Sequence, residues 1–250
     1  MSLDNPKLHR NLIPIDNETV LWQYMNLYKF EKIIQSQCLF FRRVSKFEDK
    51  GEGTLPVKES DFNKRKGNRQ GFDSRHKNEK SNTIANCWHN NIDESSYMWE
   101  KYGKQGVVIK SSLERIYMAF ENIHERIQHS AVRYIDYKND TWFNPKTYPH
   151  LEYNTFTPLV HKVKDKYEKE REFRLMICVN IEGFDNDIYW KSQESENGKM
   201  ISVDLNCLIE KIIICPNTQQ KKKKLIEKSI NNAGFSFKVV NSSLVSEVHS

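Results

Sequence analysis

Apolar residues recur along the chain with two different periods, one typical of strands and one typical of helices. Residues 20–25 and 38–44 predict strands, and the segment between them predicts a helix that begins after Asn26, whose side chain can cap it. The apolar face of that helix comprises Leu27, Phe30, Ile33 and Ile34. The chain therefore opens with a strand, a helix and a second strand.

The same patterns continue to the end of the chain. Further strands are predicted at 83–89, 106–110, 130–137, 173–180, 200–205, 211–215 and 236–240. Helices are predicted at 94–102 after an Asp93 cap and with Gly103 as a left-handed stop, from 113 after a Ser112 cap, from Pro158, and from Thr218 to Gly234. Because strands and helices are interspersed without a regular series, we expect an α+β fold with a mixed or split β-sheet and flanking helices, in one domain over residues 1–250.

One segment departs from this pattern. Residues 58–80 contain eight basic and four acidic residues and only two large apolar ones, Phe62 and Phe72. Such a segment buries little apolar surface, so we interpret it as a mobile, loosely packed excursion, with a phosphate-binding arm as the alternative.

Composition limits the classes of protein further. Hydrophobic residues make up 38% of the chain, enough for a core, and no apolar run approaches the roughly 18 residues of a membrane span. The polar start of the chain lacks the pattern of a signal peptide, and the five cysteines form no CxxC pair. We therefore expect a cytoplasmic protein with buried free thiols and no zinc site. The net charge of +6 is compatible with an anionic ligand.

Four consecutive lysines, Lys221 to Lys224, invite a nucleic-acid interpretation. Consecutive helix residues spread over about 300° of the helix axis, so the four do not share one face. We interpret the run as a solvated helix end.

Several polar residues stand at the ends of predicted strands, where chemistry is often located. Arg42 and Arg43 end the second strand and precede a loop with Asp49 and Glu52. Two guanidinium groups beside carboxylates can bind an anion or pair with those carboxylates. His89 ends the strand at 83–89 and is either a structural hydrogen-bonding residue or a candidate acid–base or binding group.

Two aromatic residues of the helix at 94–102 lie about one turn apart. Trp99 and Tyr102 either pack in the core or offer a surface for a flat ring such as a base or nicotinamide.

The last group of candidate residues combines basic and acidic side chains. Lys162 precedes Glu170, Glu172 and Arg174, which share one face if a strand starts near Glu170. Such residues either form a buried ion-pair network, or one glutamate stabilises a developing cation while the other orients a nucleophile. The sequence lacks the motifs of P-loop, Rossmann, α/β-hydrolase and zincin enzymes.

The order of these motifs resembles an uncharacterised bacterial family, domain of unknown function 2971. The resemblance covers nearly all of residues 20–245 and rests on Leu21-Trp22-x-Tyr24, Phe47-Glu48-Asp49-x-x-Glu52-Gly53, Met98-Trp99-x-x-Tyr102-Gly103, Val132-Arg133-Tyr134 and Lys162 with Glu170-x-Glu172-x-Arg174. In the family loop a proline and an aromatic residue usually stand where this chain has Lys50 and Gly51. The family name implies no reaction.

A more distant similarity, to ADP-ribosyltransferase folds, suggests chemistry. Those folds place a polar residue in the first strand, an aromatic or hydroxyl residue near nicotinamide, and a catalytic glutamate at a later strand. The positions matching that order are Gln23 or Arg42, then Tyr97 or Tyr102, then Glu170 or Glu172. The resemblance implies that the glutamate stabilises an oxocarbenium-like transition state as nicotinamide leaves, with NAD as the nucleotide.

Three functions follow as hypotheses. The first is an ADP-ribosyltransferase-like enzyme in bacterial defence or toxin systems, with Glu170 and Glu172 as catalytic residues. The second is a module that binds nucleic acid or a nucleotide through Arg42, Arg43 and residues 58–80. The third is a metal-dependent nuclease that uses Asp49, Glu52, Glu170 and Glu172.

Overall fold

The computed structural model describes residues 13–49, 51, 53–58, 79–123, 125–142, 156–179, 197–216 and 218–244. Contacts divide the chain into two compact units. Unit 1 comprises Met1–Pro14, Phe40–Asn86 and Glu125–Lys199, and unit 2 comprises Ile15–Leu39, Cys87–His124 and Met200–Ser250. The chain passes repeatedly between these two units, and the single domain over residues 1–250 stays a prediction from sequence. Most of the basic excursion, residues 59–78, lies outside the described residues.

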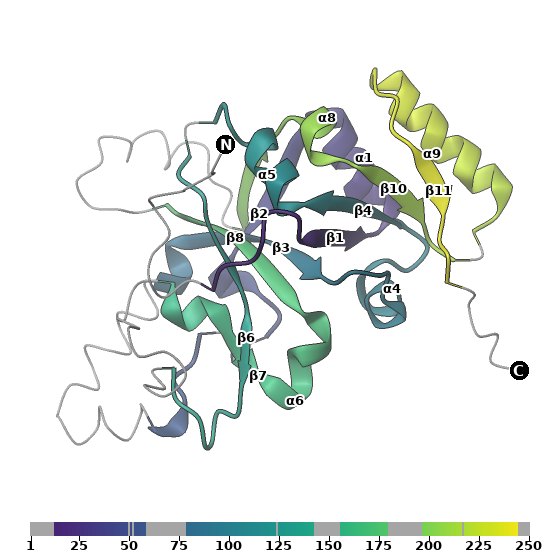
Figure 1. Cartoon of the computed structure of the whole chain (residues 1–250). Coiled ribbons are helices and arrows are strands. Elements are labelled where there is room, and N and C mark those ends of the chain that lie inside the picture. Colours follow the sequence, from purple (N-terminus) through teal and green to yellow (C-terminus); the bar gives the residue numbers. More distant parts are fainter. Residues whose placement is uncertain are drawn as a thin grey trace, which may run out of the picture. The chain divides into compact units, whose positions relative to one another are not determined.

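The described residues form a mixed sheet of nine strands with helices beside it, which confirms the predicted α+β class (Figure 1). Five of its strand pairs are antiparallel, and β10 (Lys211–Ile214) pairs in parallel with β11 (Val239–Asn241). Two short strands, β6 (Arg133–Ile135) and β7 (His161–Val163), pair in parallel separately. In the described ranges no helix is long and apolar enough to cross a lipid bilayer.

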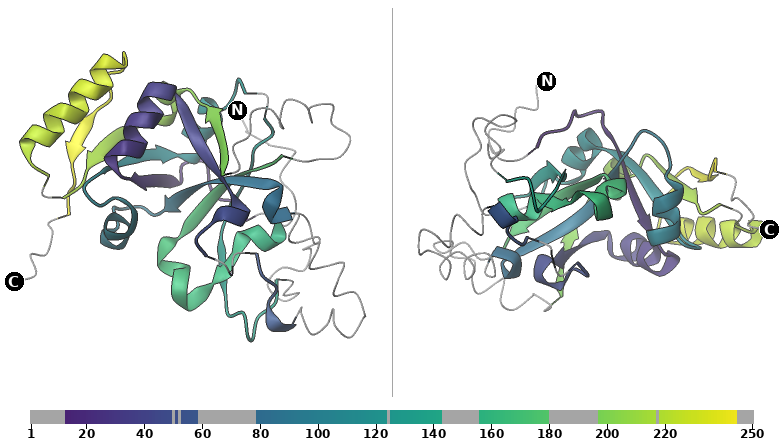
Figure 2. Two further views of the ribbon diagram at one scale, coloured as in Figure 1. Left: turned by 180° about the vertical axis from the view of Figure 1, so that it is seen from behind. Right: turned by 90° about the horizontal axis from the view of Figure 1, so that it is seen from below.

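Unit 2 is built around β1 (Val20–Met25), which pairs along its whole length with β4 (Val107–Ser112). Strand β10 lies on the other side of β4, and α9 (Gln220–Asn232) connects β10 to β11. Figure 2 shows α1 (Leu27–Ser36) and α9 on the same side of this part of the sheet. The unit also contains α4 (Ser96–Tyr102), α5 (Leu113–Ala119) and α8 (Leu205–Leu208).

Local signals set most helix ends in unit 2. Asn26 caps α1 by accepting from Lys29 N at 2.9 Å, and Ser112 caps α5, both as predicted. The cap of α4 is Ser95 rather than Asp93. Gly103 ends α4 without a left-handed conformation, at φ −100°. A Cβ there would lie 2.4 Å from Trp99, so close packing accounts for this glycine.

Unit 1 contains the other parts of the sheet. Strand β2 (Cys38–Arg43) pairs through Arg42 and Arg43 with β3 (Thr83–Asn90), whose last four residues belong to unit 2. Strand β8 (Glu172–Cys178) pairs with both β3 and β5 (Gln128–Ala131). The remaining strand of the sheet is β9 (Gly198–Ser202), which pairs with β2 and of which only Gly198 and Lys199 belong to unit 1.

The helix predicted from Pro158 is the main error in unit 1. The segment is divided into a 3-10 turn at Thr157–Val160, strand β7, helix α6 (Lys164–Tyr167) and a second 3-10 turn at Glu168–Glu170. Pairing of His161–Val163 with Arg133–Ile135 takes the place of helical hydrogen bonds in the middle of the segment. This non-local pairing is invisible to a local apolar period.

Candidate functional site

Four charged side chains predicted to act together do meet, and they are buried in unit 1. Lys162 comes from β7, Glu170 from the 3-10 turn after α6, and Glu172 and Arg174 from the start of β8. None of them is more than 7% exposed as a residue, and Arg174 is fully buried. Two cations and two carboxylates make the cluster neutral overall, which reduces the free energy cost of burying its charges.

Lys162 connects the two carboxylates. Its Nζ donates to Glu170 Oε2 at 2.7 Å and to Glu172 Oε2 at 3.1 Å. The same ammonium lies 4.3 Å from the centroid of the Tyr167 ring, at a cation–π distance. The lysine is thereby held as an ammonium ion and is not a candidate nucleophile.

Arg174 fixes the orientation of Glu172. Its Nε donates to Glu172 Oε1 at 2.8 Å and its Nη2 donates to Glu172 Oε2 at 3.1 Å, a bidentate pair. Its Nη1 donates to the carbonyl of Leu159, and the guanidinium lies 5.5 Å from the Phe47 ring centroid. Glu172 Oε2 therefore accepts the two longer contacts, from two different cations.

Tyr134 contacts the cluster through the backbone of Glu172. Its hydroxyl accepts from Glu172 N at 2.7 Å, and Tyr134 stands opposite Lys162 in the β6–β7 pairing. Burial, and then the charge of Glu172, raises the pKa of Tyr134 above its ordinary value. The phenol is therefore neutral and anchors the first residue of β8.

The route of the chain into β8 differs from the prediction. The common face of all three residues was conditional on a strand that starts near Glu170. The strand begins at Glu172, and Arg171 takes a left-handed conformation with φ 41°. Glu172 and Arg174 share a face by strand period, as predicted. Glu170 joins them from the 3-10 turn instead, and the left-handed Arg171 separates that turn from the strand.

A second buried group lies on the strand pair next to the cluster. The imidazole of His161 contacts the Thr157 carbonyl through Nδ1 at 2.6 Å and Arg133 Nη1 through Nε2 at 3.3 Å. A carbonyl only accepts and a guanidinium only donates, so His161 carries its proton on Nδ1 and is neutral. Burial lowers the pKa of His161 to about 3, and the charge of Arg133 acts in the same direction.

The predicted residues around β2 have separate environments. The side chain of Arg42 is exposed, and Arg43 Nη1 donates to the Ser81 carbonyl. Asp49 Oδ1 accepts from Gly51 N at 3.0 Å, which closes a small turn. Glu52 lies outside the described residues.

Three further candidates belong to unit 2. His89 is 1% exposed, and its ring stands edge-on to Tyr24, 5.9 Å between centroids. Trp99 is buried in a core cluster with Tyr24 and Met98, which follows the core-packing alternative. Tyr102 is 44% exposed, with the Lys101 ammonium 5.3 Å from its ring centroid.

Three parts of the site have no direct signal in the sequence. Phe47 appeared only inside the loop motif, Tyr134 only inside the Val-x-Tyr motif, and the Leu159 carbonyl in no motif. All three contact Arg174 or Glu172. The available signal was that Phe47 and Tyr134 each belong to a motif of the same suspected family as the glutamates. Residues of motifs that occur together can meet in one site.

The cysteines are free, as expected, but they are partly exposed rather than buried. Over the residues with described positions, no group of three or more His, Cys, Asp or Glu could hold a metal ion. Comparison with known proteins gives no match among protein-family models, curated proteins or solved structures. The two family resemblances stay predictions from sequence.

Proposed function

We propose that the chain is a nucleotide-handling enzyme of the ADP-ribosyltransferase type, acting on NAD or another nucleotide. The observation that carries this proposal is the meeting of Glu170 and Glu172 on a shared lysine, Lys162. Two carboxylates in one buried group supply the two roles that glycosidic transfer requires: stabilisation of a cationic sugar and orientation of the acceptor.

Glu172 is the better candidate to stabilise the sugar cation. Arg174 holds its Oε1 at 2.8 Å, whereas Oε2 is held by two contacts of 3.1 Å. A ribose hydroxyl can replace the Lys162 contact at Oε2, because Lys162 retains its shorter bond to Glu170. The carboxylate then faces the sugar in an orientation that Arg174 has already set.

Glu170 is the better candidate to orient the acceptor. Its Oε2 is fixed by Lys162 at 2.7 Å, and it projects from a turn rather than from the sheet. The N-glycosidic bond to nicotinamide breaks as the acceptor oxygen bonds to the ribose carbon, nicotinamide leaves as a neutral base, and the acceptor proton passes to a base such as Glu170.

The nuclease hypothesis receives less support from this arrangement. A divalent cation at Glu170 and Glu172 would have to displace two side-chain cations that already neutralise them. The nucleotide-binding hypothesis depends on Arg42 and Arg43. Arg43 already donates a hydrogen bond to the Ser81 carbonyl within the protein.

The test is release of nicotinamide from labelled NAD by the purified full chain, with and without a cell lysate as a source of acceptors. We expect release that Glu172→Gln abolishes and Glu170→Gln reduces. Glu210→Gln is the matched control, since Glu210 pairs with Lys110 in a partly exposed ion pair of unit 2. Folding of each variant is checked by circular dichroism and a thermal melt. No release by the folded wild-type chain, or equal release by folded Glu172→Gln, would overturn the proposal.

A further inference from the structure

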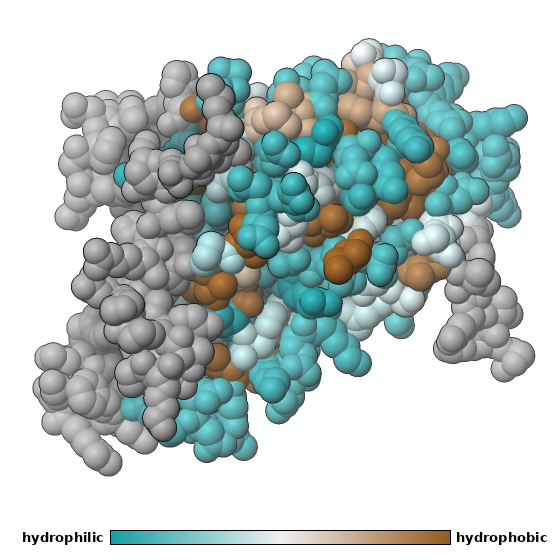
Figure 3. Space-filling view, in the orientation of Figure 1, coloured by the Kyte–Doolittle hydropathy of each residue, from teal (hydrophilic) through white to brown (hydrophobic). Residues whose placement is uncertain are grey.

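The C-terminal part of unit 2 concentrates positive charge. Residues 211–244, which contain β10, α9 and β11, carry seven lysines and one acidic residue, Glu227. The excess of six equals the formal net charge of the whole chain. The surface over α9 is correspondingly hydrophilic (Figure 3).

Helix α9 separates its lysines from its apolar residues. Ile226 and Ile230 are 1% exposed and face the protein. Lys221, Lys224 and Lys228 are exposed, and their spacing places them within about 60° of one another around the helix axis. These three residues, termed the lysine stripe below, extend over about 10 Å of the helix. The four consecutive lysines have no common face, but Lys228 lies on the same face as Lys221 and Lys224 and completes the stripe.

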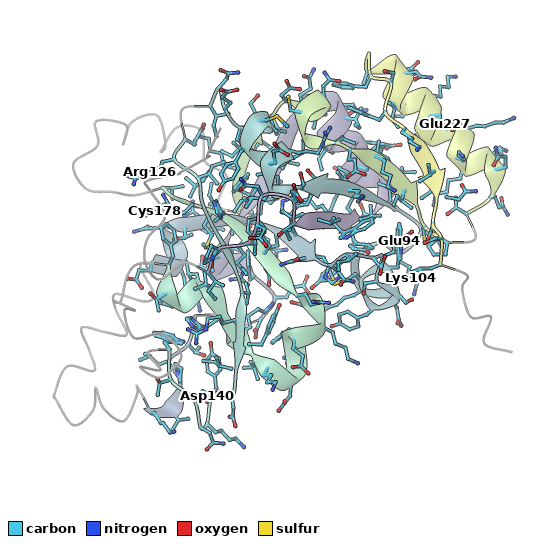
Figure 4. All side chains as sticks on the ribbon, viewed as in Figure 1. Glu94, Lys104, Arg126, Asp140, Cys178 and Glu227 are labelled. Carbon is cyan, nitrogen blue, oxygen red and sulfur yellow. The ribbon has the colours of Figure 1, made fainter. Side chains whose placement is uncertain are left out.

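The other two lysines of the run are engaged within the protein. Lys222 Nζ donates to the Gln105 carbonyl, and Lys223 lies 4.0 Å from Glu227 in an i,i+4 pair. Figure 4 shows Glu227 on the outer part of α9. Within the described part of the chain, the lysine stripe itself has no acidic partner in ion-pair contact.

We propose that the lysine stripe binds the phosphodiester backbone of nucleic acid without sequence preference. Three ammonium groups in a row complement a row of phosphates, and their flexible stems require no fixed geometry of the partner. A lipid surface is a poorer partner, because Ile226 and Ile230 are buried in the protein and leave the outward face with the single apolar side chain of Leu225. This inference does not depend on the chemistry proposed for unit 1.

The experiment measures fluorescence anisotropy of a mixed-sequence oligonucleotide of about 20 nucleotides, single-stranded and as a duplex, with the full chain. Potassium chloride is varied from about 50 to 200 mM. The variant K221Q/K224Q/K228Q removes the stripe. The control K138Q/K164Q/K169Q removes the same charge from exposed positions in unit 1. The variant E227Q removes the acidic residue of α9.

We expect the wild type and the control to bind alike, and the stripe variant to bind roughly a hundredfold more weakly at low salt. Its plot of log affinity against log salt should be less steep by about 2 for the single strand and nearly 3 for the duplex. E227Q should bind several-fold more tightly. Unchanged binding by the folded stripe variant, equal weakening by the control, or binding to anionic phospholipid vesicles but not to either oligonucleotide would overturn the proposal.

Discussion

The guanidinium of Arg174 lies over the ring of Phe47, 5.5 Å from its centroid, and so joins two sequence motifs that are far apart along the chain. Phe47 also packs against the core cluster of Val44, Ala85, Phe156, Leu159, Val160 and Met176. The charge cluster is thereby attached to the hydrophobic core of unit 1 through one cation. Arg174 holds Glu172 on one side and the aromatic ring on the other, which makes it the residue on which the geometry of the cluster most depends.

Replacement of Arg174 by methionine should strongly destabilise the chain. The side chain is fully buried, and its removal leaves the charge of Glu172 compensated only by Lys162, which also neutralises Glu170. Breaking a buried ion pair from one side costs about 3–5 kcal/mol of unfolding free energy. Urea unfolding of the two proteins measures this difference.

The partly exposed pair of Lys110 and Glu210 provides the control for that measurement. Its side chains are 19% and 39% exposed, so Lys110→Met should change the unfolding free energy by about 1 kcal/mol or less. Equal losses for the two variants would show that burial of Arg174 does not set the strength of its interactions.

Lys162 and Glu170 should prove energetically coupled. Either Lys162→Gln or Glu170→Gln leaves the neutral cluster with one unbalanced buried charge, whereas the double variant restores neutrality. The double variant should therefore lose less stability than the sum of the single losses, by roughly 1–3 kcal/mol. A double-mutant cycle from denaturant unfolding measures the coupling. Strict additivity would mean that Lys162 is balanced by Glu172 alone.

Two predicted helices, α1 and the one from Pro158, show why some sequence predictions succeeded and others failed. The α1 prediction succeeded because its signals are local: the Asn26 cap and an apolar face whose Phe30, Ile33 and Ile34 are buried. The helix predicted from Pro158 failed because β7 exists only through pairing with β6, whose residues lie more than twenty positions earlier. Local periodicity contains no information about such a partner.

The candidate site divides in the same way. The common face of Glu172 and Arg174 follows from strand period and was predicted. The position of Glu170 depends on a left-handed Arg171, and no glycine marks that conformation in the sequence. The burial of Trp99 depends on its contact with Tyr24, with centroids 5.1 Å apart, which joins a helix to a strand distant in sequence. The chemical types of the candidate side chains could be predicted from the sequence, whereas their positions in the structure depend on tertiary contacts.

Hydrogen bonds to Glu94, termed the latch below, should hold the C-terminal segment of unit 2 in place. Glu94 is labelled in Figure 4. Its Oε1 accepts from Ser243 N and Oγ at 3.0 Å, and its Oε2 accepts from Ser242 Oγ and from Trp99 Nε1. Replacement by alanine removes all four hydrogen bonds and should cost about 1–2 kcal/mol, since the carboxylate is partly solvated. Hydrogen exchange of the Ser243 amide should become faster in Glu94→Ala, while exchange in β1 stays unchanged.

Glu94 should also make the latch sensitive to acid. Burial alone would raise the pKa of Glu94, but the hydrogen bonds from Ser242, Ser243 and Trp99 outweigh it and hold that pKa below its ordinary value. The stabilisation is therefore present above the ordinary carboxyl pKa and is lost as the pH falls through the lowered value. Exchange at Ser243 in the wild type should approach that of Glu94→Ala only in strong acid. Equal exchange at Ser243 in the wild type and Glu94→Ala, compared at the same near-neutral pH, would contradict the assignment.

Stability of unit 1 should fall on mild acidification because of its buried histidines. Burial lowers the pKa of His161 to about 3 and that of His129 to about 4, whereas both titrate near 6.5 in the unfolded chain. The unfolded state therefore binds more protons below pH 6.5, and the unfolding free energy decreases as the pH falls through that value towards the folded pKa. His161 alone should contribute a loss of about 2 kcal/mol between pH 6.5 and pH 5.

The variant His161→Gln separates this effect from general acid denaturation. Glutamine can still donate to the Thr157 carbonyl, the contact that His161 Nδ1 makes, but it does not titrate. Its stability at pH 7.5 should be lower than that of the wild type, because the shape of the ring is lost. Its further loss on going to pH 5 should be smaller by about 2 kcal/mol, since a glutamine at position 161 takes up no proton on unfolding. Parallel pH profiles for the two proteins would mean that His161 is already protonated in the folded state, and that its proton on Nε2 has displaced the contact with Arg133.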